Sequence, residues 1–173
     1  MNYSLIRACD IANGPGVRVS LFVSGCTHHC PGCFQPETWN FNAGQPFIWK
    51  TQYRIFELLQ PDYIEGLTIL GGEPLEPSNQ RDLLPFVEAV RREFPNKTIW
   101  TYTGFTFEEL MNRTGEYGAV TESLLSQMDI LVDGPFIEAK KDLRLKFCGS
   151  SNQRLIDLRK TKEAGKIVLW EGE

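Results

Sequence analysis

Residues 17–34 read VRVSLFVSGCTHHCPGCF, and this stretch decides how the chain folds around its reactive part. The first eight residues are mostly apolar or β-branched, which is typical of a buried strand. Gly25 ends this strand, and three cysteines follow between positions 26 and 33. The cysteines are therefore expected in a loop at the carboxyl end of a buried strand.

Outward from this stretch, helix and strand patterns alternate along the chain. Strands are expected at residues 67–70, 97–102 and 129–132, and helices at 51–60, 78–94 (capped by Ser78), 107–111 and 122–128. Two later pieces, 154–157 and 167–170, have the pattern of edge strands. The alternation predicts an α/β fold with a mainly parallel sheet, which binds ligands at the carboxyl ends of its strands. The length of 173 residues predicts a single domain over residues 1–173.

Composition narrows the classes of partner. The formal net charge is −4 and no run of lysine or arginine is present, so nucleic acid is not an expected partner. No apolar stretch reaches the roughly 18 to 20 residues of a membrane span, and the first residues lack a signal-peptide pattern, so we expect a cytoplasmic protein. Five cysteines, three of them clustered, then indicate metal or redox chemistry rather than disulfides.

The cysteine loop has the spacing CxxxCxxC at Cys26, Cys30 and Cys33. Thiolates are soft ligands that suit iron-sulfur clusters. A [4Fe-4S] cluster has four irons and the loop offers three thiolates, which leaves one iron open for a substrate. Zinc, with His28 or His29 as a fourth ligand, is the alternative. Structural zinc sites usually draw on two separated ligand pairs, and the chain has no second pair.

Four further residues bear on the cysteine loop. Gly32 lets the backbone come close to cluster sulfides. Phe34 follows Cys33 directly and is expected either over a planar base or in the core. The lone cysteines Cys9 and Cys148 are typical of small buried hydrophobes, and either is an alternative fourth ligand.

A second motif, Gly71-Gly72-Glu73-Pro74, follows the apolar run at 67–70 and so falls at the end of a neighbouring strand. Two glycines allow a close approach and leave backbone carbonyls to accept hydrogen bonds from an ammonium group. Taken alone, the same residues form a tight turn. The expected position next to the cysteine loop favours the binding interpretation.

The two motifs together resemble the radical S-adenosylmethionine (SAM) superfamily, which has CxxxCxxC followed by an aromatic residue and a GGE motif for the amino group of SAM. Residues 13–18, NGPGVR, are similar to a segment of glycyl radical enzyme activases. Three parts of the chain, 25–47, 99–105 (IWTYTGF) and 131–136 (LVDGPF), resemble the activating proteins of anaerobic ribonucleoside-triphosphate reductases.

The segment GSSNQR at 149–154 also resembles that family, so the resemblance covers about residues 1–157. Two positions depart from it. Cys148 stands where the family often has arginine, and Phe105 stands in place of a common tyrosine. Neither position belongs to the cysteine loop.

The resemblance implies a radical SAM oxidoreductase with an open partial (βα) barrel, since a complete eight-stranded barrel usually needs about 250 residues. It implies a [4Fe-4S] cluster on the three cysteines and reductive cleavage of SAM. The resulting radical would take hydrogen from a glycine of the reductase, with a flavodoxin-like or other low-potential electron donor. The alternatives are an activase of another glycyl radical enzyme, such as pyruvate formate-lyase, and a zinc-binding interaction module.

The resemblance also assigns site residues. Those expected around SAM are Gly32, Cys33 and Phe34 along its length, and Gly71, Gly72 and Glu73 at its amino acid portion. Asp133 is expected near SAM or a monovalent cation, or else in a turn. Two further groups of residues each allow two interpretations. Ser150, Asn152 and Gln153 are expected either to contact SAM or the reductase, or to form hydrogen bonds within their own loop. Trp39, Phe41 and Phe47 are expected either on a docking face or in the core.

Overall fold

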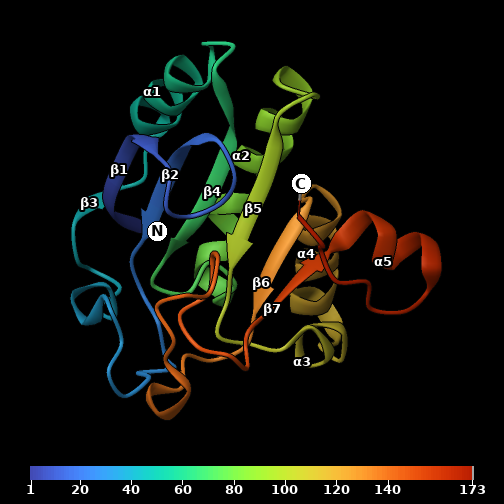
Figure 1. The fold of residues 1–173 in the computed structure, drawn as a ribbon. Helices are drawn as coiled ribbons and strands as arrows, with labels where there is room; N and C mark the ends of the chain where they lie inside the picture. The colour runs from blue at the N-terminus through green and yellow to red at the C-terminus, as the bar shows by residue number, and fades with distance from the viewer. Residues whose placement is uncertain (173) are drawn as a thin grey trace.

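The structure is a computed structural model that describes residues 1–172 (Figure 1). Within that range, seven strands form one sheet in the order β3-β1-β2-β4-β5-β6-β7. The central strands β2, β4, β5 and β6 are parallel, while β1, β3 and β7 pair antiparallel at the two sides. The strands are β1 (Asn2–Asp10), β2 (Val17–Val23), β3 (Gln45–Pro46), β4 (Ile64–Gly71), β5 (Thr98–Tyr102), β6 (Ile130–Asp133) and β7 (Arg154–Asp157).

Helices fill each crossover between the parallel strands, as the alternation predicts. α1 joins β2 to β4, α2 joins β4 to β5, and α3 with α4 joins β5 to β6, while α5 follows β7. In Figure 1, α2 and α4 lie behind the strands. The helices are α1 (Trp49–Leu59), α2 (Pro77–Glu93), α3 (Phe107–Met111), α4 (Gly115–Ser126) and α5 (Leu158–Ala164), with short 3-10 turns at Pro36–Thr38 and Glu138–Lys140.

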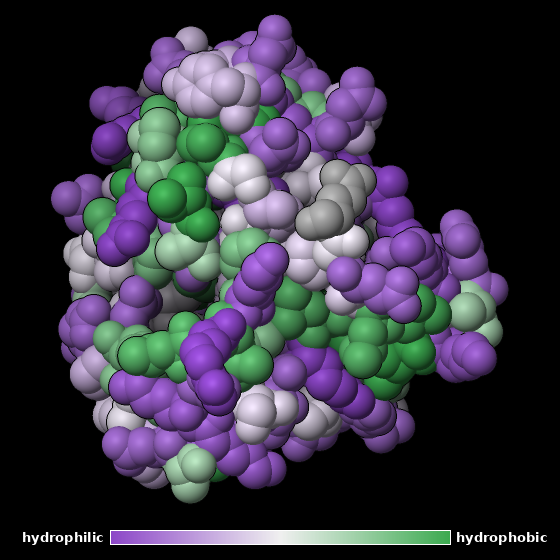
Figure 2. Space-filling model, viewed as in Figure 1, coloured by the Kyte–Doolittle hydropathy of each residue, from purple (hydrophilic) through white to green (hydrophobic). Residues whose placement is uncertain are grey.

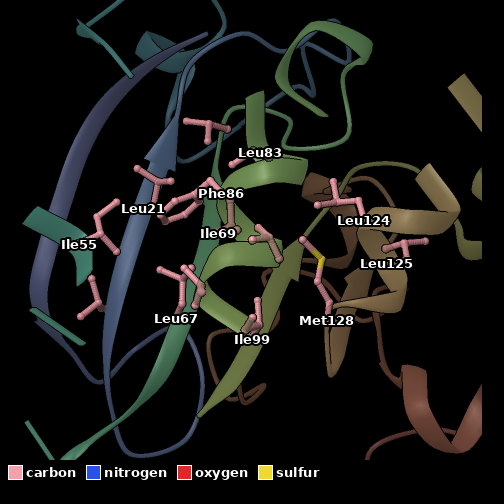
Figure 3. Packing of buried hydrophobic residues seen from close by; sticks show 14 of the residues in the cluster. Leu21, Ile55, Leu67, Ile69, Leu83, Phe86, Ile99, Leu124, Leu125 and Met128 are labelled. Carbon is pink, nitrogen blue, oxygen red and sulfur yellow. The ribbon is translucent and has the colours of Figure 1, made fainter. Parts of the chain in front are cut away.

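The main core lies between the sheet and these helices. Alternate residues of the parallel strands point into it, because side chains of a strand alternate between its two faces. Figure 3 shows them meeting residues of α1, α2 and α4. The labelled members are Leu21, Ile55, Leu67, Ile69, Leu83, Phe86, Ile99, Leu124, Leu125 and Met128, all of them buried.

The opposite side of the sheet, which we call the open face, carries no helix of this core. A smaller buried cluster of Trp100, Ile130 and Val132 lies there, and Phe147 and Trp170 pack against it from the later part of the chain. Within residues 1–172 the sheet is not closed, because β3 and β7 are its two edges and do not pair. The expected α/β fold with a parallel centre is confirmed, and the radical SAM type of barrel stays a prediction.

Arg18 is a fully buried charge in β2 on the open face. Its guanidinium donates to Thr68 Oγ1 (2.7 Å), Thr98 Oγ1 (2.8 Å), the Leu67 carbonyl (2.9 Å) and the Thr98 carbonyl (3.0 Å). The ring of Trp100 lies 5.4 Å from the guanidinium carbon. Burial lowers the pKa of Arg18 to about 10, so the group is still charged at neutral pH. Arg18 therefore joins β2, β4 and β5 beneath the open face.

Several details differ from the sequence expectations. β1 is not apparent from the sequence because most of its side chains remain partly or fully exposed, which hides the apolar alternation. α2 starts at Pro77 with Glu76 as its N-cap, so the expected Ser78 cap is wrong; proline favours the first helical position through its fixed φ. α4 begins at Gly115, before the expected start at residue 122. The expected strand at 167–170 is reduced to a single bridge between Ile156 and Leu169.

Candidate functional site

The cysteine loop leaves the carboxyl end of β2 and is closed at its neck by the chain that returns from it. Gly25 N donates to the Thr38 carbonyl (2.7 Å), and Cys26 N donates to the Trp39 carbonyl (3.1 Å). Gly25 has φ +97°, and a Cβ there would lie 2.3 Å from the ring of Phe41. Only glycine fits this neck, so the local sequence determines where the loop begins.

The three cysteines line a single cavity of about 430 Å³, together with Gly71 and Gly72. This volume lies within the range of about 300–1,000 Å³ for ligand pockets. Cys26 is buried, while Cys30 and Cys33 are partly exposed. Among residues 1–172, no three histidine, cysteine or acidic side chains converge on one point that would hold a single metal ion. In a cubane cluster each cysteine binds a different iron, so thiols spread over one cavity wall fit that group.

Burial sets the protonation of two of these thiols, Cys26 and Cys30. It raises the pKa of Cys26 to about 11 and also raises the pKa of Cys30. Both thiols are therefore protonated at neutral pH in the metal-free protein. Because thiolates are the ligands of iron, cluster binding must release these protons.

The Gly71-Gly72 turn extends β4 alongside the cysteine loop. Gly72 N donates to the Val23 carbonyl and Glu73 N donates to the Gly25 carbonyl, both at 2.8 Å. A Cβ at Gly72 would lie 2.6 Å from the Gly25 carbonyl oxygen. The absence of a side chain at Gly72 thus allows the two motifs to share one backbone ladder at the ends of β2 and β4.

Glu73 is 1% exposed, and its carboxylate is fully engaged inside the protein. One oxygen accepts from Thr103 Oγ1 (2.9 Å) and Leu75 N (2.8 Å). The other accepts from Gly104 N (2.7 Å) and faces His28 Nε2 (3.0 Å). Glu73 therefore ties together the ends of β4 and β5 and the cysteine loop.

The two histidines of the cysteine loop have different surroundings. The hydrogen bond with Glu73 raises the pKa of His28 above its ordinary value. His29 stacks on Trp39 with ring centroids 4.5 Å apart and has φ +47°, an uncommon conformation for a residue with a side chain. Both residues support the shape of the loop.

Phe34 belongs to the cavity wall and not to the core, because it is 56% exposed. Its ring lies 4.9 Å from that of Phe136. The neighbouring Gly32 has φ +72°, and a Cβ there would lie 2.8 Å from the carboxyl carbon of Glu138. The core interpretation of Phe34 is therefore wrong, and the two phenylalanines form an aromatic wall beside the cysteines.

Asp133 lies at the end of β6, but its carboxylate is occupied by partners within the protein. It is 1% exposed and accepts from Phe107 N at 2.8 Å and from Arg154 Nε at 3.0 Å. Arg154 also pairs with Glu108 on α3 at 2.7 Å. Asp133 therefore anchors the start of α3 to β6 and β7, while the next residue, Gly134, lines the cavity.

This anchor predicts an acid-sensitive contribution to stability. The hydrogen bond from Arg154 lowers the pKa of Glu108 from 4.5 to about 2. A carboxyl group whose pKa is lower in the folded protein stabilises the fold at pH values above its pKa in the unfolded chain. This stabilisation is lost as the pH falls towards 2. We expect Glu108→Gln to cost at most about 1 kcal/mol at pH 7, because the pair is exposed, and nothing near pH 2. Urea unfolding at both pH values measures this, and a cost that grows in acid would contradict it.

The late segment 150–153 organises its own loop. Ser150 Oγ accepts from Ile137 N (3.2 Å), and Asn152 Nδ2 donates to the Pro135 carbonyl (2.8 Å). Gln153 accepts from Gly149 N at 2.8 Å and also lines the cavity. These contacts agree with the interpretation as bonds within the loop, and Gln153 alone of the three also faces the site.

The three aromatic residues whose interpretation is open between a docking face and the core differ in their surroundings. Phe47 is only 7% exposed and packs against Phe86, so its interpretation as a core residue is confirmed. Phe41 covers Gly25 at the neck of the cysteine loop. Trp39 is a cavity-lining residue that stacks on His29. Trp39 and Phe41 therefore support the cysteine loop, and a docking role for Phe41, which is 38% exposed, stays a prediction.

Tyr102 is a site residue that the sequence analysis does not single out. It lies at the end of β5 and lines the cavity, and within residues 1–172 its buried hydroxyl has no hydrogen-bond partner. Burial raises the pKa of Tyr102, so the group stays a neutral donor. The signal in the sequence is its even spacing from Trp100, since both side chains must then point to the same face of β5.

Comparison with known proteins extends this picture. The family described as 4Fe-4S single cluster domain matches residues 12–156. An anaerobic ribonucleoside-triphosphate reductase-activating protein of Escherichia coli (strain K12) is 42% identical over 161 residues, which are 92% of this chain and 100% of the relative. Proteins of the same name from Pasteurella multocida and Enterobacteria phage T4 are 44% and 41% identical, over 88% and 90% of this chain and 95% and 93% of the relatives.

The chain belongs to the family of anaerobic ribonucleoside-triphosphate reductase-activating proteins. The matched cluster domain of this activating-protein family contains the cysteine loop, the Gly71-Gly72 turn and β6. α5 begins at Leu158, just beyond the match, and Leu158 packs into the main core. None of the helices within residues 1–172 combines the length and the hydropathy required to span a membrane.

The two expected departures from the activating-protein family both lie beside the cavity. Cys148 lines it, and burial raises the pKa of this thiol to about 11. Phe105 packs its ring 4.3 Å from that of His28 and 4.3 Å from the guanidinium carbon of Arg113. Cys9, by contrast, is exposed on β1. Of the two lone cysteines, Cys148 is therefore the one that shares a cavity with the three loop cysteines.

Proposed function

We propose that this chain binds a [4Fe-4S] cluster and SAM and uses them to form a glycyl radical on anaerobic ribonucleoside-triphosphate reductase. The observation that carries the proposal is the meeting of the three thiols with the Gly71-Gly72 backbone in one cavity of about 430 Å³. These two motifs come from the adjacent parallel strands β2 and β4. The names of the relatives, which state activation of that reductase, support the choice of target.

When bound, the cluster and SAM supply a radical that removes a hydrogen atom from a glycine Cα. The residues of the chain hold and orient these groups. Cys26, Cys30 and Cys33 provide three thiolates, which leaves one position open for the amino acid portion of SAM. The carbonyls of the Gly71-Gly72 turn accept hydrogen bonds from its ammonium group, and the buried Glu73 network keeps that turn in place.

Water must be kept from a reactive radical, and the cavity wall is suited to this. Phe34 and Phe136 form its aromatic side, and Leu143, Leu145 and Phe147 add an apolar edge. Cys30 and Cys33 remain partly exposed, so a flavodoxin-like or other low-potential donor can approach the cluster from outside. Desolvation on one side and electron entry on the other agree with the proposed reaction.

We expect the Tyr102 hydroxyl to donate to a polar atom of SAM. It lies on β5, the strand next to the Gly71-Gly72 turn of β4, and it has no partner in residues 1–172. Tyr102→Phe should raise the SAM dissociation constant of the cluster-loaded protein about fivefold, the equivalent of one hydrogen bond of about 1 kcal/mol. Tyr63→Phe is the matched control, since Tyr63 is exposed. Equal SAM affinities for the two variants would contradict this assignment.

The proposed function is tested under anaerobic conditions. The protein is reconstituted with iron and sulfide and mixed with reductant, SAM and the reductase from the same genome. Electron paramagnetic resonance should then show a glycyl doublet on the reductase, and deoxyadenosine should accumulate. Deoxyadenosine without a doublet would support SAM cleavage but overturn the target, and other glycyl radical enzymes would then be tried. A colourless protein that retains one zinc would overturn the cluster assignment.

A further inference from the structure

A hairpin of residues 140–151, which we call the rim hairpin, borders the cysteine cavity on the open face. Ser151 N donates to the Lys140 carbonyl (2.9 Å), and Lys141 and Ser150 form an antiparallel bridge. Asp142 N reaches the Gly149 carbonyl (3.4 Å), so the tip comprises residues 143–148. The hairpin follows the short turn Glu138–Lys140 and precedes β7.

The tip of the rim hairpin alternates apolar and basic residues. Leu143, Leu145 and Phe147 line the cavity, whereas Arg144 and Lys146 are exposed to solvent. Leu143 is 83% exposed, the largest exposure among the big apolar residues of the described chain. Figure 2 shows hydrophobic and hydrophilic residues side by side around a hollow on this face. The tip thus presents an apolar edge to the cavity and a charged edge to the outside.

The charge of the rim hairpin is opposite to that of the whole chain. Residues 140–146, KKDLRLK, contain four cationic side chains and one anionic one, whereas the chain carries a formal net charge of −4. Asp142 pairs with Arg144 at 2.9 Å, which leaves the three lysines in excess. A local positive patch at the mouth of a cavity attracts and orients an acidic partner surface.

The geometry of the proposed reaction requires contact at this rim. Hydrogen abstraction occurs only when the radical and the glycine Cα are within about 3–3.5 Å of each other. A cavity of about 430 Å³ that is to hold the cluster and SAM leaves room only for a narrow segment of a large protein at its mouth. Helices of the main core cover the other face of the sheet, so this segment must enter across the open face, where the rim hairpin lies.

We propose that the rim hairpin is the docking element for the glycine-bearing segment of the reductase. The apolar edge, with Leu143 foremost, packs against that segment as it enters the cavity. The exposed Lys140 and Lys146 pair with acidic residues of the reductase that flank the segment. This inference rests on the proposed function for the identity of the partner, but it concerns a different part of the molecule from the cluster ligands.

The test uses the double variant Lys140→Gln/Lys146→Gln of the cluster-loaded protein. Its matched control is Lys162→Gln/Lys166→Gln, which removes two exposed positive charges near α5. Affinity for the reductase is measured by biolayer interferometry at low salt and at about 0.3 M salt, where charge attraction is largely screened. SAM cleavage driven by a chemical reductant is measured in the absence of the reductase.

The rim variant should bind the reductase about tenfold more weakly at low salt, with a smaller difference at high salt. The control should bind like the wild type, and both variants should cleave SAM at the wild-type rate. Equal affinities for rim variant and control would overturn the docking role. If no protein cleaves SAM but the rim variant alone loses affinity, the proposed function fails while the docking surface stands.

Discussion

Replacing Cys30 by alanine is expected to abolish the iron content and the glycyl radical yield together. Only three loop cysteines line the cavity, so the variant retains two thiolates for a group that needs at least three. Changes to residues that merely orient a metal ligand already cost about 10–100-fold in affinity or activity, and loss of the ligand itself should exceed this range. Iron and sulfide analysis, absorption near 400 nm and electron paramagnetic resonance measure the effect.

The chain offers two controls for this experiment. Cys9→Ala removes a thiol that is exposed on β1 and should leave both iron content and radical yield unchanged. Cys148→Ala removes a thiol that lines the same cavity. If Cys148 is a fourth ligand of the cluster, Cys148→Ala will lose iron as Cys30→Ala does. That result would mean that the wild-type cluster has no iron open for SAM. Retention of a full cluster by Cys30→Ala would overturn the assignment of the ligands.

Arg18→Met is expected to destabilise the cluster-free fold by about 3–5 kcal/mol, the largest stability effect that we expect from a single substitution. Methionine keeps most of the buried volume but provides no donor. The Leu67 and Thr98 carbonyls and the two threonine hydroxyls that now accept from the guanidinium would lose this partner. Each unsatisfied buried polar group costs about 1–3 kcal/mol. Urea unfolding followed by circular dichroism measures the change.

The control for Arg18 is Arg159→Met. Arg159 pairs with Asp129 at 2.6 Å, but its side chain is 63% exposed, so its loss should cost less than about 1 kcal/mol. Arg18→Lys should be intermediate, because an ammonium group keeps the charge but cannot reach all four acceptors at once. A cost for Arg18→Met as small as that for Arg159→Met would show that the strands do not depend on the buried guanidinium.

The position of the cysteine loop and of the Gly71-Gly72 turn follows from local signals. A buried strand that runs into glycine and then cysteine can be recognised from neighbouring residues alone, and the same is true of the apolar run before Gly71. Parallel strands with helical crossovers place their carboxyl ends along one edge of the sheet. For this reason the sequence predicts that the two motifs are neighbours, and the cavity contains both.

Local sequence patterns do not determine the roles of side chains whose partners are distant in the sequence. Asp133 has the position expected of a ligand residue, but Arg154, 21 positions later, occupies its carboxylate. Phe47 allows both a docking and a core interpretation, and only its contact with Phe86 shows that it belongs to the core. Glu73 is in the expected motif, but only the fold shows that its carboxylate is bound to Thr103, Gly104 and His28. A single residue does not reveal which remote group will meet it.

By itself, the sequence determined the α/β fold class, the order of the central elements, the place of the three-cysteine loop and the adjacency of the glycine turn, since each depends on the spacing of nearby residues. The tertiary structure alone decided the partners of Arg18, the unpartnered Tyr102 hydroxyl and the placement of the rim hairpin over the cavity. These features arise where loops and strands far apart in the chain meet on the open face. The free energy of each buried polar group depends on its burial and on its hydrogen-bond partners, which only the folded chain supplies.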